Sequence, residues 1–174
     1  DWSSDVCSSD LPLLRIYLSI LFFCSVVGYV PTIFAIEVGD QLLLGTVTTV
    51  DGRVMDQAYW NQRNTLVQVW ATWCPFCKKQ NVHLDQLVKK IPPHSLNVLT
   101  LSIDKQESLV VNYMNKNNYD FPVAMMTPQL SQAIGKRRGV PELYILDKRG
   151  VVIQKDYGLM IDLDFFELSK YAQK

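Results

Sequence analysis

The stretch TLVQVWATWCPFCKKQ, from Thr65 to Gln80, carries the pattern that decides the fold. It begins with an apolar run rich in β-branched residues, Thr65 to Ala71, which is typical of a strand buried on both faces. A helical pattern follows from Lys78 to Ile91, and Cys74 and Cys77 lie between the two elements. A cysteine at the first turn of a helix lies near unpaired backbone N–H groups, which favour its thiolate form.

Strand and helix signals alternate on both sides of this stretch. Residues 42–55 predict a hairpin around an Asp-Gly turn, and residues 142–154 predict a second hairpin. The other patterns predict strands over 96–104 and 121–126, and helices over 107–118, 129–135 and 162–172. The resulting order, β-β-β-α-β-α-β-α-β-β-α, predicts an α/β fold with a central mixed sheet flanked by helices.

The composition limits the possible functions. A chain of 174 residues with 48% hydrophobic content can build one domain with a substantial core, which we place at residues 37–174. The 17 basic and 17 acidic residues give a formal net charge of zero. No basic stripe with interleaved aromatic residues is present, so nucleic acid is not expected as a partner.

Two segments precede this domain. Residues 1–11, DWSSDVCSSDL, read in one frame as the translation of a common sequencing-adapter oligonucleotide, and we set them aside as an artefact. Residues 12–36 carry no charge after Arg15 and predict a signal sequence or an N-terminal transmembrane anchor, cleaved or retained. A domain that follows such a segment would lie outside the cytoplasm, where disulfides form.

The cysteine count favours redox chemistry. Cys7 belongs to the adapter stretch and Cys24 to the apolar segment, which leaves only Cys74 and Cys77 in the domain. A zinc site needs four ligands, and no second pair is available, so no metal is expected. A structural disulfide across two residues would close too small a loop to add much stability. We therefore predict a redox-active Cys74–Cys77 disulfide, with no other cofactor, in which Cys74 attacks and Cys77 resolves.

Three motifs carry a resemblance to a known family. They are VWATWCPFCKK (residues 69–79), GVPELYILDKRGVV (residues 139–152) and Tyr157-Gly158. With them the chain, over roughly residues 40–172, resembles the thioredoxin-like TlpA/ResA/DsbE (CcmG) family of exported, membrane-anchored thiol-disulfide oxidoreductases. The resemblance implies a thioredoxin-like fold with an N-terminal β-hairpin, and a catalytic pair formed by Cys74 and Cys77.

The resemblance also implies how neighbouring residues support the pair. A cis Pro141 would pack against the cysteines, and Val140 would offer its backbone to a client peptide. Glu142 would lie near the cysteines and tune them, or else would be a solvated residue at the start of a strand. The residues expected to support the pair are Trp73, Pro75, Phe76, Val140, Pro141 and Glu142, and of these the resemblance supplies the last three. One departure is Gln80, which stands where many relatives carry a glutamate.

The favoured function is that of a periplasmic protein disulfide reductase. Its expected clients are disulfide-bearing proteins, such as apocytochrome c in cytochrome c maturation. The family resemblance implies a membrane thiol-disulfide carrier as its electron donor. An oxidase that forms disulfides remains open, because direction depends on reduction potential. A thiol peroxidase is less favoured, since Val67 and Ala71 occupy the motif positions for its proline and hydroxyl residues. The fourth hypothesis is a non-catalytic module that binds client proteins.

Overall fold

The computed structural model describes residues 35–172, which belong to the compact unit Ile33–Lys174. The adapter-like stretch and nearly all of the predicted signal or anchor segment lie outside the described residues. Among residues 35–172, no helix combines the length and the apolar character needed to cross a membrane.

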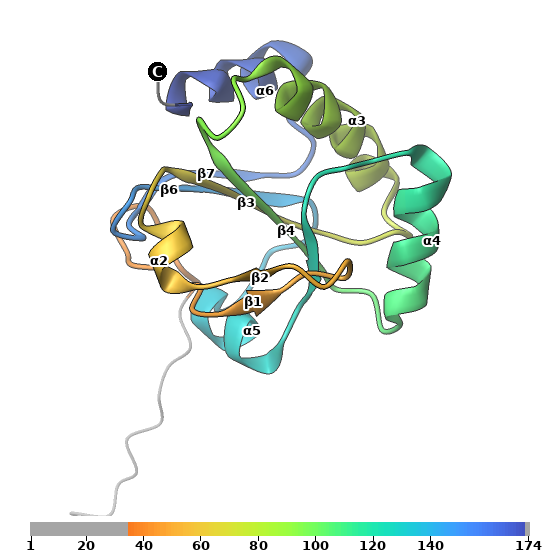
Figure 1. Ribbon diagram of the computed structural model, residues 1–174, viewed down its shortest axis with the longest axis horizontal. Coiled ribbons are helices and arrows are strands. Elements are labelled where there is room, and N and C mark those ends of the chain that lie inside the picture. The colour runs from red at the N-terminus through yellow and green to blue at the C-terminus, as the bar shows by residue number, and fades with distance from the viewer. Residues whose placement is uncertain (1–34, 173–174) are drawn as a thin grey trace, which may run out of the picture. The chain divides into compact units, whose positions relative to one another are not determined.

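The core element is a five-stranded sheet in the order β5-β4-β3-β6-β7 (Figure 1). The strands β3, β4 and β5 are parallel, whereas β6 is antiparallel to both β3 and β7. Their bounds are Thr65–Trp70 (β3), Asn97–Ser102 (β4), Val123–Met125 (β5), Glu142–Leu146 (β6) and Val152–Tyr157 (β7). The predicted mixed sheet is therefore confirmed.

Helices cover both faces of this sheet, as the alternating pattern predicted (Figure 1). One face packs against α3, α4 and α6, and the other packs against α2, α5 and the N-terminal hairpin. The bounds are Gln57–Trp60 (α2), Pro75–Lys90 (α3), Glu107–Asn117 (α4), Pro128–Ile134 (α5) and Asp162–Glu167 (α6), followed by a 3-10 turn over Leu168–Tyr171.

Strand β3 shows why the sheet has this two-sided core. Leu66 and Trp70 point into the core under α3, whereas Val67 and Val69 point into the core under α5. Successive side chains of a strand alternate between faces, so a strand covered on both sides is apolar throughout. The end of β3 carries the chain directly into the cysteine motif.

The N-terminal hairpin is confirmed but short. It pairs β1 (Val47–Thr48) with β2 (Val54–Met55). The preceding segment instead pairs with the free edge of β7, where the N–H of Leu42 donates to the carbonyl of Gly150 at 2.7 Å. Gly150 has φ 79°, and an added Cβ there would lie 2.8 Å from the Leu42 carbonyl oxygen. This close approach therefore requires glycine.

Candidate active site

Cys74 is the N-cap residue of α3, and it lies where β3 delivers the chain to the helix. Its Sγ accepts a hydrogen bond from the backbone N–H of Cys77 at 3.1 Å. Pro75 occupies the first helical turn, where a missing N–H costs nothing. The sulfur thereby takes the role that a serine or aspartate side chain has at most helix starts. The helix begins three residues before the predicted Lys78, because the cysteine itself caps it.

Cys77 lies one turn further along and is fully buried, while both cysteines are free thiols. Burial raises the pKa of the Cys77 thiol far above its ordinary value, and the neighbouring Cys74 raises it further. Cys77 therefore keeps its proton at neutral pH. The order in which Cys74 attacks and Cys77 resolves stays a prediction.

The Val140–Pro141 peptide bond is cis, as the family resemblance implied. The Val140 carbonyl oxygen lies 3.5 Å from Cys74 Sγ, so the thiol can donate to it. The Pro141 carbonyl accepts the N–H of Gly158 at 2.8 Å, which fixes this loop to the end of β7. Two segments separated by 66 residues thus meet at the first cysteine.

Two aromatic side chains flank Cys74 at the protein surface. Trp73 is 64% exposed and Phe76 is 54% exposed, although both are large apolar groups. Trp70, which precedes them in the motif, is completely buried and packs against Tyr113, with 5.2 Å between ring centroids. The entrance to the site is therefore apolar, and the side chain of Trp70 beneath it belongs to the hydrophobic core.

Asp104 braces the loop before the cysteines, and sequence reasoning missed it. Its carboxylate accepts the backbone N–H of Thr72 at 2.9 Å and the Thr72 hydroxyl at 2.7 Å. The Ser102 hydroxyl donates to the same carboxylate at 2.7 Å. A serine and an aspartate that end a buried strand were the available signal, but nothing in the sequence linked them to a residue 32 positions away.

A chain of buried amide groups lies beneath the site. Gln80 donates to Gln68 Oε1 at 3.1 Å and accepts the backbone N–H of Met160 at 3.1 Å. Gln68 donates in turn to Asn81 at 2.7 Å, and Asn81 reaches the Tyr113 hydroxyl at 3.4 Å. Gln68, Gln80 and Asn81 are fully buried. Gln80, which stands where many relatives carry a glutamate, thus belongs to a layer made only of neutral side chains.

Glu142 is buried, with only 1% of its surface exposed, and neither carboxylate oxygen has a hydrogen-bond partner. Strand alternation places it on the face of the sheet opposite α3, with Tyr144 rather than Leu143. Burial raises the pKa of its carboxyl, and the positive charges of Lys155 and Arg137 oppose that shift. The structure therefore corrects the expectation of a solvated residue, and places Glu142 beside Pro141 but on the opposite face of the sheet from Cys77.

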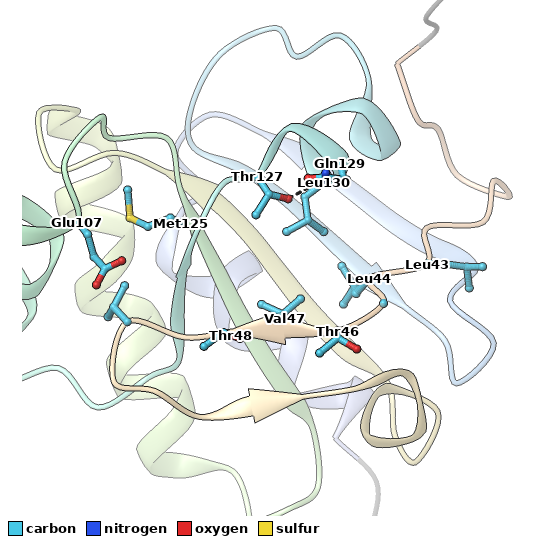
Figure 2. A pocket seen from close by; sticks show the side chains of 12 residues that line it. Leu43, Leu44, Thr46, Val47, Thr48, Glu107, Met125, Thr127, Gln129 and Leu130 are labelled. Atoms are coloured by element: carbon cyan, nitrogen blue, oxygen red, sulfur yellow. Dashed lines mark hydrogen bonds between the residues drawn. The ribbon is translucent and has the colours of Figure 1, made fainter.

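Other candidate sites carry no comparable chemistry. Within residues 35–172, no three His, Cys, Asp or Glu side chains are grouped as a metal site would require. A hollow of about 510 Å³ lies between β1 and the start of α5 (Figure 2). Its lining includes Leu44, Val47, Met125 and Leu130 but neither cysteine, so it is separate from the dithiol.

The family model for Redoxin matches residues 37–173. This chain belongs to the Redoxin family. A similar relative is the thiol-disulfide oxidoreductase ResA of Bacillus thuringiensis subsp. konkukian, which is 26% identical over 84% of this chain and 87% of its own length. The thiol:disulfide interchange protein DsbE of Vibrio cholerae is 25% identical, over 62% of this chain and 56% of its own length.

Solved structures give the same result for the fold of this Redoxin protein. A thioredoxin-family thiol:disulfide interchange protein from Chlorobium tepidum TLS matches with a TM-score of 0.69 and 26% identity, over 79% of this chain and 99% of its own. The fold is thioredoxin-like, and the resemblance to the TlpA/ResA/DsbE group is confirmed. With its capped dithiol, the chain is a thiol-disulfide oxidoreductase of the ResA and DsbE type.

Proposed function

We propose that this protein is an extracytoplasmic disulfide reductase that passes two electrons from Cys74 and Cys77 to disulfides in client proteins. The observation that carries the proposal is the asymmetry of the pair. Both cysteines are buried, but Cys74 caps α3 beside the cis Pro141, whereas burial raises the pKa of the Cys77 thiol. One thiol can attack, and the other is held back until it is needed.

The same asymmetry supports the reducing direction. A dithiol becomes a strong oxidant when its reduced form is stabilised, which happens when a thiolate is well solvated or hydrogen-bonded. Here Cys74 Sγ accepts one hydrogen bond from a backbone N–H, and buried Cys77 retains its proton. We propose that this single hydrogen bond stabilises the reduced form only modestly, so that the pair gives up its electrons readily.

The reaction proceeds in two exchanges. Cys74 first loses its proton to solvent, and its thiolate attacks one sulfur of a client disulfide. A mixed disulfide forms, and the other client sulfur leaves as a thiolate that takes up a proton. Cys77 then loses its proton and attacks the Cys74 sulfur. The mixed disulfide breaks, the second client thiol is released, and the Cys74–Cys77 disulfide remains. The client gains two electrons and two protons, and the protein loses the same number.

The compartment, clients and donor are part of the proposal. The apolar stretch at residues 12–36 supports export, with or without retention as an inner-membrane anchor, into a periplasmic or equivalent space. Apocytochrome c and other disulfide-bearing proteins are the clients that the family resemblance implies. A membrane thiol-disulfide carrier would return the Cys74–Cys77 disulfide to the reduced state after each turnover.

The deciding experiment measures the reduction potential of the Cys74–Cys77 pair in the full chain, together with its rate of insulin disulfide reduction. We expect a potential well below that of the surrounding thiol pool, and loss of activity in Cys74→Ser. A potential near that of strongly oxidising proteins would reverse the direction and make the chain an oxidase. Unchanged activity in Cys74→Ser would refute the dithiol mechanism, and client binding that survives loss of both cysteines would identify a non-catalytic module.

A further inference from the structure

Exposed apolar side chains lie on α3 and on the chain segment that lines a hollow beside it. Of the twelve large hydrophobic residues that are exposed in residues 35–172, six lie on the first half of α3, just before it, or on the segment from β7 into α6. These six are Trp73, Phe76, Val82, Leu159, Ile161 and Leu163. A gathering of this kind on a monomer surface marks a binding site more often than a random scatter does.

Part of this surface is hollowed into a groove. We call it the α3 groove: it has a volume of about 460 Å³ and is lined by Lys79, Val82, His83 and the segment Leu159–Asp162. Two contacts hold its walls together. Gln80 accepts the N–H of Met160 at 3.1 Å, and His83 Nε2 lies 3.1 Å from a carboxylate oxygen of Asp162. The groove is therefore formed before anything binds to it.

The α3 groove continues the line of the active site. Phe76, Lys79 and His83 occupy successive turns of one helix face, and Cys74 caps that helix. A rise of about 1.5 Å per residue places Val82 about 12 Å along the helix axis from Cys74. An extended peptide covers about 3.3 Å per residue, so about four residues span this distance.

The end of the α3 groove nearer the cysteines is positively charged, and Asp162 adds one carboxylate on the other wall. Lys78 and Lys79 are exposed at the end nearer the cysteines. The carboxylate that faces them across the groove belongs to Asp162, and it is engaged by His83. An occupant with a carboxylate near its apolar side chain would match both features.

We propose that the α3 groove binds the extended client segment that flanks the reactive cysteine. The segment carries a large apolar side chain about four residues from that cysteine, next to an acidic residue. This inference rests on the proposed function and deepens it by naming the class of client. Covalent attachment at Cys74 brings the segment to the groove, because a mixed disulfide holds the client chain beside Phe76 while it lasts.

The test uses the full chain with Cys77→Ser, reduced, and short peptides that contain one cysteine activated as a mixed disulfide with thionitrobenzoate. A single leucine is placed two, four or six residues from the cysteine, on either side, and release of the coloured thiol gives the attack rate. We expect a maximum at four residues on one side, about fivefold above a peptide without leucine. A glutamate beside that leucine raises the rate further, and a lysine lowers it.

Variants separate the possible outcomes. Val82→Glu in the same background removes the maximum, whereas Val54→Glu, which changes an even more exposed valine on β2, keeps it. A flat dependence on leucine position, or a maximum that survives Val82→Glu, overturns the groove assignment while leaving the proposed function intact. Rates no higher than those of a chain that also carries Cys74→Ser refute the proposed function itself, together with the inference that depends on it.

Discussion

The two hydrogen bonds from Thr72 to the Asp104 carboxylate give the most direct test of how the loop before the cysteines is held in place. Removal of the Thr72 hydroxyl in Thr72→Val deletes one hydrogen bond to a carboxylate, which we expect to cost about 1.5 kcal/mol of unfolding free energy. Asp104→Ala deletes three, leaves the Thr72 N–H without its partner, and should cost about 3 to 5 kcal/mol. The double variant loses less than the sum, with a coupling of about 1 to 2 kcal/mol.

These hydrogen bonds also affect the reduction potential of the Cys74–Cys77 pair, because Thr72 lies two residues before Cys74. A looser loop weakens the hydrogen bond from the Cys77 N–H to Cys74 Sγ and therefore destabilises the reduced form. We expect Thr72→Val to lower the reduction potential by about 10 to 20 mV, since 30 mV corresponds to about 1.4 kcal/mol.

The matched control is Thr100→Val, which removes a hydroxyl that donates to the Pro122 carbonyl at 3.0 Å in the same sheet. It should lose comparable stability and leave the potential unchanged. Urea unfolding followed by tryptophan fluorescence gives the free energies, and equilibration with glutathione buffers gives the potentials. Additive stability losses for Thr72→Val and Asp104→Ala, or an equal shift of potential in Thr100→Val, would refute the reasoning.

Three further outcomes follow from the buried groups. Gln80→Glu places a carboxylate among fully buried amide groups, so we expect it to lower the free energy of unfolding by about 2 kcal/mol at pH 8. The lost stability should return as the pH falls and the carboxyl group takes up a proton. A loss that denaturant unfolding shows to be independent of pH would contradict this. Glu142→Gln should be about 1 to 2 kcal/mol more stable than the parent at pH 7. Because burial raises the folded-state pKa above its ordinary value of 4.5, ionisation costs stability as pH rises through that pKa, so the gain should disappear below about pH 4.5, and a constant gain across pH would show another cause. In the reduced protein at pH 8, iodoacetamide should label Cys74 at least about tenfold faster than Cys77, as judged by peptide mass mapping; equal labelling would contradict the raised Cys77 pKa.

The sequence was sufficient for most of the fold because the main elements have strong periodic patterns. Strand β3 was recognisable from its apolar run, and the helix after it was recognisable from the helical spacing that follows the cysteine motif. The short helix Gln57–Trp60 was not predicted, since four residues are too few to show a helical period. The pairing of the segment around Leu42 with the edge of β7 was also missed, because it depends on contacts between residues more than one hundred positions apart.

The candidate site was predictable where it is local in sequence. Cys74, Cys77 and Pro75 act through a single strand-to-helix junction, and their roles follow from the chemistry of a helix start. The cis bond at Pro141 required the family resemblance, since an X-Pro bond is trans by default. The surroundings of Glu142 could not be inferred, because the face on which a strand residue lies depends on the register of the whole sheet.

The neutral layer beneath Cys77 has a consequence for proton movement. Each turnover releases a proton from Cys77, yet Gln80, Gln68 and Asn81 cannot accept one, and the pKa of Tyr113 is raised by burial. We therefore expect the proton to leave through the entrance of the site, where the departing client sulfur can accept it. Turnover would then follow the basicity of the client's own thiol more closely than any internal acid, and the client would supply part of the catalysis of its own reduction.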